Sequence, residues 1–69
     1  MKEIKIVTDI IKLDQLLKWA GVAQSGAQAK EMVLSGIVSV NGQTVLQRGK
    51  KITHGDRVSI EGIEELVVI

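Results

Sequence analysis

The strongest candidate for chemistry in this sequence is a basic segment, Arg48-Gly49-Lys50-Lys51. Three cations within four residues repel one another, and a chain of 69 residues has little stability with which to offset that repulsion. A bound anion would relieve it, so we interpret the basic segment as an anion-binding site. It is not a phosphate loop of the nucleotide-hydrolase kind, because the upstream glycine at the required spacing and the following helix are both missing.

Residues suited to catalysis or to metal binding are few. His54 is the one histidine and falls in a predicted turn, and no serine is flanked by the glycines of a nucleophile elbow. The absence of cysteine excludes disulfides, a thiol nucleophile and a cysteine-rich zinc site. Glu64 and Glu65 are neighbours in a predicted strand, where they would face opposite sides. We therefore expect no catalytic residue, no metal site and no cofactor.

Charge is distributed unevenly along the chain, although the formal net charge is only +1. Residues 12–51 contain six basic and two acidic residues, a net charge of +4. The remaining residues contain three basic and six acidic residues, a net charge of −3. Lys12, Lys18 and Lys30, which belong to the positive part, would each be unremarkable on a solvated surface. Together with the basic segment they predict one positive face directed at an anionic partner.

Hydrophobic periodicity predicts the elements that must position these residues. Alternation over residues 3–8 predicts a strand, and apolar residues at a spacing of three and four predict a helix over residues 13–20. A second helix is predicted from Ser25, which with Gln28 forms a capping box, to Gly36. The two short helices are joined by a four-residue turn that starts with a glycine.

The second half of the chain changes to the period of a strand. Residues 38–40 and 44–46 flank Asn41-Gly42, the strongest short signal for a hairpin, and further strands are predicted over residues 58–60 and 66–69. Two helices followed by a glycine-turned antiparallel sheet, with one strand in front, predict an α+β fold. The length allows one domain, residues 1–69.

Two large apolar side chains do not fit the predicted core. Trp19 lies away from the apolar stripe of its helix and shares a face with Lys12 and Gln15. It can cover the edge of the core, stack on a base or sugar, or contact a partner. Leu34 lies away from the stripe of the second helix, so it is either exposed or covered by the sheet.

Several segments taken together resemble the S4 RNA-binding domain. They are Lys12-Leu13-Asp14-Gln15-Leu16-Leu17, then Ser25-Gly26-Ala27-Gln28-Ala29-Lys30, then Gly36-Ile37-Val38-Ser39-Val40-Asn41-Gly42, and later Gly55-Asp56-Arg57-Val58. The resemblance covers about residues 11–60, and the basic segment is similar to that of the small stand-alone YaaA-type members. It implies an αL motif, in which two helices and the following hairpin bind structured RNA such as ribosomal or transfer RNA.

Carried over residue by residue, the resemblance places Lys12, Gln28 and Lys30 among the RNA contacts. With the remaining cations of the positive part, the candidate RNA-binding residues are Lys12, Lys18, Gln28, Lys30, Arg48, Lys50 and Lys51. Two departures from the family pattern weaken the second helix as an RNA contact. Gly26 stands where the family often has arginine, and Leu34 stands where it often has a polar or basic residue.

We therefore expect a non-catalytic, monomeric, cytoplasmic protein that binds structured RNA and associates with the ribosome. Cations and helix N-termini would contact phosphates, and the scarcity of aromatic residues argues against reading single-stranded bases. No membrane partner is expected, because no apolar run is long enough for a membrane span. Two alternatives remain open: a helix-turn-helix-like DNA-binding module, and a protein-interaction module that uses Leu34 and residues 66–69.

Overall fold

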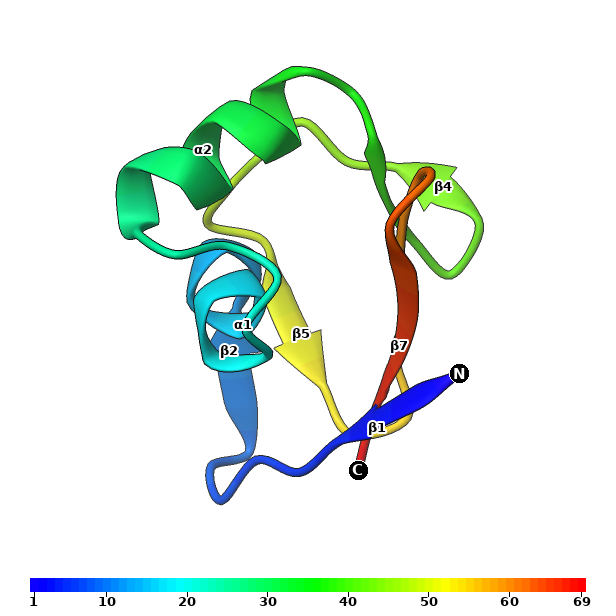
Figure 1. Ribbon diagram of the computed structural model, residues 1–69. Helices are drawn as coiled ribbons and strands as arrows, with labels where there is room; N and C mark the ends of the chain where they lie inside the picture. The colour runs from blue at the N-terminus through cyan, green and yellow to red at the C-terminus, as the bar shows by residue number, and fades with distance from the viewer.

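The computed structural model describes residues 1–69 and confirms an α+β fold. Two helices lie on one side of the molecule and a five-stranded sheet lies on the other (Figure 1). In chain order the elements are β1 (Lys2–Ile4), β2 (Ile10–Lys12), α1 (Leu13–Trp19), α2 (Gly26–Leu34), β3 (Val38–Val40), β4 (Gln43–Thr44), β5 (Lys51–Thr53), β6 (Arg57–Ile60) and β7 (Glu64–Val68). None of the helices has the length and apolar character needed to cross a membrane.

The strands form two sheets, whereas the sequence predicted one antiparallel sheet. The larger sheet has the order β1-β7-β6-β3-β4, and its pairs are antiparallel except β1 with β7, which is parallel. The smaller sheet pairs β2 with β5 in antiparallel fashion, with Ile11 opposite Ile52. These two strands have three residues each, which is too short for an alternating pattern to reveal them.

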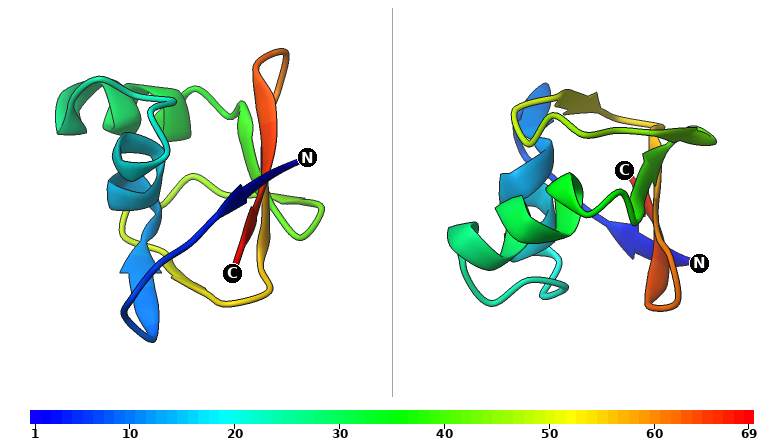
Figure 2. Two further views of the ribbon diagram at one scale, coloured as in Figure 1. Left: turned by 60° about the horizontal axis from the view of Figure 1, so that its bottom comes forward. Right: turned by 90° about the horizontal axis from the view of Figure 1, so that it is seen from above.

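The core lies between the two helices and the strands, and it is entirely aliphatic. All 16 buried residues are apolar, and no buried side-chain nitrogen or oxygen lacks a partner. Leu13, Leu16 and Leu17 of α1 are completely buried, as the predicted apolar stripe requires. The space between the two layers of ribbon in Figure 2 is filled by these side chains and by those of the sheet. Hydrophobic burial therefore supplies the stability of a fold that has no disulfide.

The predicted helix ends are confirmed to within a residue or two, and the predicted capping box of α2 is confirmed in one of its two hydrogen bonds. Gly21 and Gly36 follow α1 and α2 with φ of 78° and 84°, the left-handed conformation that glycine adopts without strain. The Ser25 hydroxyl accepts a hydrogen bond from the Gln28 N–H at 3.1 Å and so caps α2. The Gln28 side-chain oxygen accepts from the N–H of Gln24 at 2.6 Å, one residue before the position that a regular capping box uses.

The strands differ from the predicted ones mainly at their ends. The strand predicted over residues 3–8 is shorter and lies at Lys2–Ile4, and the return strand of the hairpin is Gln43–Thr44 rather than residues 44–46. β6 and β7 begin one and two residues earlier than predicted. The hairpin itself is confirmed, because Asn41 and Gly42 have φ of 51° and 86°, as a type I′ turn requires.

Candidate functional site

The basic segment is attached to the first turn of α1 by main-chain hydrogen bonds. Lys12, the N-cap residue of α1, makes no side-chain cap. Instead, the carbonyl of Lys50 accepts from the N–H of Leu13 at 2.8 Å, and that of Arg48 accepts from the N–H of Asp14 at 3.0 Å. Two of the N–H groups that a helix leaves without intrahelical partners are thus satisfied by the basic segment. The segment is held by its backbone, and its side chains are not needed for the attachment.

This arrangement changes how α1 can contact an anion. We expected helix N-termini to contribute to phosphate binding. In α1 the first two N–H groups are bonded to the basic segment, and the third, of Gln15, donates to the Asp14 carboxylate at 2.8 Å. The N-terminus of α1 is therefore occupied by the protein's own oxygens. What remains for an anion at this end of α1 is the charge of the side chains.

Two lysines meet at the end of the smaller sheet. Lys12 in β2 lies directly opposite Lys51 in β5, and both side chains are exposed. Directly opposite residues of an antiparallel pair point to the same face, with Cβ atoms about 4.5–5.5 Å apart. That face is the outer one, because Ile11 and the buried Ile52 occupy the inner face. Two like charges in this position destabilise the sheet, so folding alone does not account for them.

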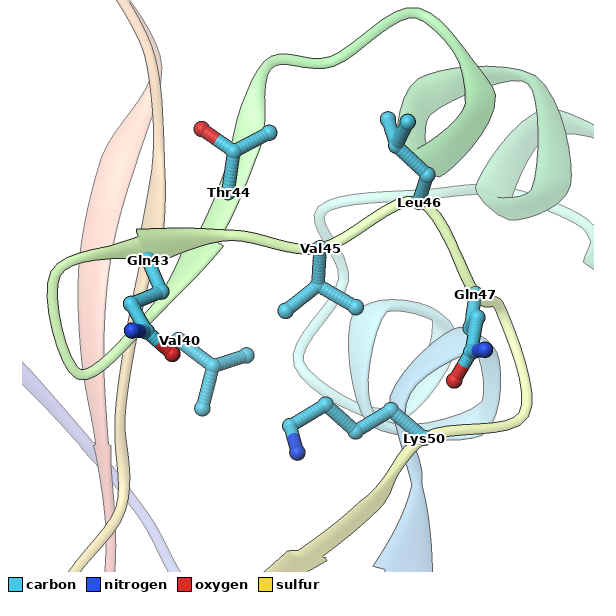
Figure 3. A pocket seen from close by; sticks show the side chains of 7 residues that line it. All are labelled: Val40, Gln43, Thr44, Val45, Leu46, Gln47 and Lys50. Atoms are coloured by element: carbon cyan, nitrogen blue, oxygen red, sulfur yellow. The ribbon is translucent and has the colours of Figure 1, made fainter.

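Lys50 points to the other side of the basic segment, into a hollow of about 400 Å³ beside the β3–β4 hairpin. Its side chain extends across the hollow toward Val40, and the side-chain amides of Gln43 and Gln47 lie at the edge (Figure 3). The basic segment thus directs Lys51 to the outer face of the smaller sheet and Lys50 toward the hairpin. Its cations cover two adjoining surfaces rather than one point.

A network of hydrogen bonds joins the hairpin turn to the β5–β6 turn. The Asp56 carboxylate accepts from the Asn41 side-chain amide at 3.0 Å, from the Thr53 N–H at 2.8 Å and from the Thr53 hydroxyl at 3.3 Å. The Asn41 side-chain oxygen in turn accepts from the N–H of Arg57 at 3.0 Å. The two turns are therefore held together by polar side chains.

The charge of Asp56 is stabilised within this network. Desolvation raises the pKa of Asp56, but the hydrogen bonds from Thr53 and Asn41, together with the nearby charge of Lys50, outweigh it and lower the pKa below its ordinary value. Asp56 is thus ionised at neutral pH and offsets part of the charge of Lys50.

The other predicted contacts lie further away or have another use. Lys18 is exposed in the last turn of α1, about 9 Å along the helix axis from Lys12, and Lys30 is exposed on α2. The side-chain oxygen of Gln28 is used in the cap of α2, so that oxygen is committed to the fold. The structure brings together Lys12 and the basic segment, and it does not add the other three to that cluster.

Sequence reasoning missed the pairing that creates this cluster. Lys12 and Lys51 are 39 positions apart, and neither β2 nor the partnership of β2 with β5 was predicted. The sequence offered only an apolar residue next to a lysine in Ile11-Lys12 and in Lys51-Ile52, which is shorter than the roughly four to eight residues over which alternation indicates a strand. The link between Asn41 and Asp56 was also missed, because each residue fits a turn by itself.

The two unassigned apolar side chains are both exposed. Leu34 is 58% exposed, so the sheet does not cover it. Trp19 is 68% exposed, and its indole N–H donates to the carbonyl of Lys5 at 3.1 Å. His54 is an exposed turn residue whose Nε2 lies 2.9 Å from the carbonyl of Thr8.

Comparison with known proteins finds a matching family and several similar proteins. A family model described as the S4 domain matches residues 4–69. The "Probable ribosome maturation protein RlbA" of Bacillus subtilis (strain 168) is 42% identical over 66 residues, which are 96% of this chain and 93% of that protein. The "Putative RNA-binding protein YbcJ" of Escherichia coli (strain K12) is 40% identical over 58 residues, which are 84% of this chain and 83% of that protein.

A larger enzyme carries a similar segment. The "Ribosomal large subunit pseudouridine synthase B" of Bacillus subtilis (strain 168) is 36% identical over 53 residues. The match covers 77% of this chain but only 21% of the synthase. The similarity therefore does not extend to most of that enzyme.

Proposed function

The chain belongs to the S4 domain family, and we propose that it is a non-catalytic protein that binds structured RNA, specifically RNA of the large ribosomal subunit. The names of two similar proteins refer to the ribosome, and that of a third refers to RNA binding. We further propose that the chain forms one domain and acts as a monomer. Transfer RNA is the other structured RNA to be tested.

The observation that carries this proposal is the cross-strand pair of Lys12 and Lys51. Directly opposite like charges lower the stability of an antiparallel pair, and a phosphate between or above them would turn that repulsion into attraction. The basic segment adds Lys50 on the adjoining surface that faces the hairpin, and Arg48 lies two residues earlier in the chain. An RNA backbone, with phosphates at regular intervals, matches cations spread over two adjoining surfaces better than an isolated small anion does.

The arrangement favours recognition by phosphate position and shape. The cations stand on a short sheet and on a segment fixed to α1, so the backbone from which their side chains extend is held in place. Contacts to phosphates position a nucleic acid without reading its sequence. If the cluster contacts about four to six phosphates, the logarithm of the binding constant falls with that of the salt concentration at a slope of about −3 to −5. Titrations at several salt concentrations measure this slope.

The site is tested by reversing both lysines of the pair. In Lys12→Glu with Lys51→Glu, two carboxylates replace two ammonium groups, so cross-strand repulsion persists and stability should change little. Affinity for a fragment of large-subunit ribosomal RNA should fall more than tenfold in a gel-shift assay, because phosphates are then repelled. Thermal unfolding followed by circular dichroism checks that the variant is folded.

A matched control is Lys2→Glu with Arg57→Glu. It changes the net charge by the same amount, but both residues lie on the five-stranded sheet. We expect this control to keep at least a third of the wild-type affinity. Equal losses in the two double variants would contradict the assigned site and indicate a response to net charge alone. Tighter binding to transfer RNA or to duplex DNA would contradict the proposed RNA target.

A further inference from the structure

Trp19 has a feature that phosphate binding does not use: a fixed and exposed aromatic face. It is the only aromatic residue among Phe, Tyr and Trp in the chain, and it is 68% exposed. Its single polar group, the indole N–H, already donates to the carbonyl of Lys5. This bond ties the ring to the segment between β1 and β2. The indole is thereby oriented, and its faces and edges remain for recognition by stacking.

Beside the indole lies an open hollow of about 350 Å³, which we call the Trp19 hollow. It is lined by Ile11, Gln15, Lys18 and Trp19. Its volume falls within the range of about 300–1,000 Å³ that is usual for small-molecule sites. The lining combines an aromatic ring, an aliphatic side chain, an amide and a cation, and it contains no carboxylate.

We propose that the Trp19 hollow accepts one unpaired nucleotide of the bound RNA, with its base stacked on the indole. The proposal rests on the proposed function and adds a second contact to it. A nucleotide combines a flat aromatic base, hydrogen-bonding edges and a phosphate, and the lining offers a counterpart for each. The ring stacks, the Gln15 amide can donate or accept, and the Lys18 ammonium attracts the phosphate.

The hollow is proposed to receive a base that is flipped out of an RNA helix while phosphates of that RNA helix contact the basic segment. Ile11 lines the hollow and directly precedes Lys12 in β2, so the hollow and the lysine pair share this strand but lie on opposite faces of it. Lys18 and Lys12 stand at the two ends of α1, about 9 Å apart along the axis. The proposal therefore requires the RNA to pass around β2, with the unpaired nucleotide in the Trp19 hollow and neighbouring phosphates at Lys12 and Lys51. The Trp19 hollow also assigns a role to Lys18, which is not part of the cluster formed by Lys12 and the basic segment.

The test compares two RNA hairpins of the same stem, one with a single bulged adenosine and one fully paired. Because Trp19 is the only tryptophan, its fluorescence reports on this site alone. We expect the bulged hairpin to quench it strongly and the paired hairpin to quench it weakly. In a gel-shift assay, Trp19→Leu should weaken binding of the bulged hairpin about tenfold and leave the paired hairpin unaffected.

The Trp19→Phe variant keeps an aromatic face without the indole N–H, so it should retain a preference for the bulged hairpin that Trp19→Leu lacks. If both hairpins bind equally to the wild type and neither quenches Trp19, this proposal is overturned while the proposed function stands. If the wild type binds the large-subunit RNA fragment but neither hairpin, this proposal alone is overturned. If it binds neither that fragment nor the hairpins, the two proposals fail together. Quenching by an acidic, leucine-containing peptide but not by the bulged hairpin would overturn the proposal in favour of a protein partner.

Discussion

The basic segment and the β5–β6 turn are both short, charged and exposed, but they use their charges in opposite ways. The carboxylate of Asp56 accepts three hydrogen bonds from Asn41 and Thr53, so its charge is used within the fold. The basic segment is attached to α1 by the carbonyls of Arg48 and Lys50, and its cationic side chains play no part in that attachment.

This difference separates residues that maintain the fold from residues that can bind a partner. A charge that receives several internal hydrogen bonds contributes to stability, and its removal should act on unfolding. Cations held next to one another by their backbone oppose folding slightly and attract anions. The charges of this small protein can therefore be tested separately, by measuring stability and affinity on the same variants.

The largest effect on stability is expected from Asp56→Ala. The substitution removes three hydrogen bonds and leaves the Asn41 amide without its acceptor, so the free energy of unfolding should fall by about 2 kcal/mol. RNA affinity should stay within about threefold of wild type, because the cations of the basic segment are unchanged. Urea unfolding and a gel-shift assay on one preparation measure both quantities. Asp9→Ala, which removes the same charge from an exposed turn, is the control and should have little effect.

A smaller effect of the same network should appear as the pH is lowered. The pKa of Asp56 is lower in the folded protein than its ordinary value, so its contribution to stability is complete above that ordinary value, about 4. As the pH falls through the lower folded pKa, the carboxylate is protonated and the contribution is lost. Urea unfolding at pH 6 and near pH 3 measures this change. If the wild-type protein loses no more stability between these two pH values than Asp56→Ala does, the loss does not come from protonation of Asp56 and the prediction is wrong.

The smallest effect, and one of opposite sign for stability and binding, is expected from Lys51→Glu alone. A glutamate opposite Lys12 replaces repulsion by attraction, which should stabilise the protein by about 0.2–1 kcal/mol. The same change should weaken RNA binding severalfold, because one phosphate contact becomes a repulsion. Lys30→Glu on α2 provides a comparison outside the lysine pair. If Lys51→Glu lowers both stability and RNA affinity, Lys51 contributes to the fold. That result would contradict the view that the cations of the basic segment are not used within the fold.

Much of the local structure was predictable because it depends on a few neighbouring residues. The type I′ turn requires two residues that tolerate positive φ, and Asn41-Gly42 supplies them. The start of α2 needs a side-chain acceptor, which Ser25 provides. Strand ends were predicted less well, because the length of a strand depends on its partner. β4 illustrates this, since its two residues pair only with Ser39 and Val40.

The site was only partly predictable for the same reason. The cations themselves were identified from residue type and spacing, and the basic segment was singled out as an anion-binding loop. Its attachment to α1 by main-chain hydrogen bonds was not predicted. Which cations come together was not visible, because the partner of Lys12 lies 39 positions away. Gln28 shows the opposite case, in which a residue assigned to RNA by resemblance also takes part in the cap of its own helix.

The sequence by itself determined the aliphatic core, the two glycine-ended helices, the hairpin and the excess of positive charge between residues 12 and 51. These properties follow from composition, periodicity and local backbone preference, which act over a few residues. Only the tertiary structure decided that Lys12 faces Lys51, that Asp56 is bonded to Asn41, and that the indole N–H of Trp19 donates to the carbonyl of Lys5. These contacts depend on which distant segments the core brings together, and that is decided by the packing of the whole chain.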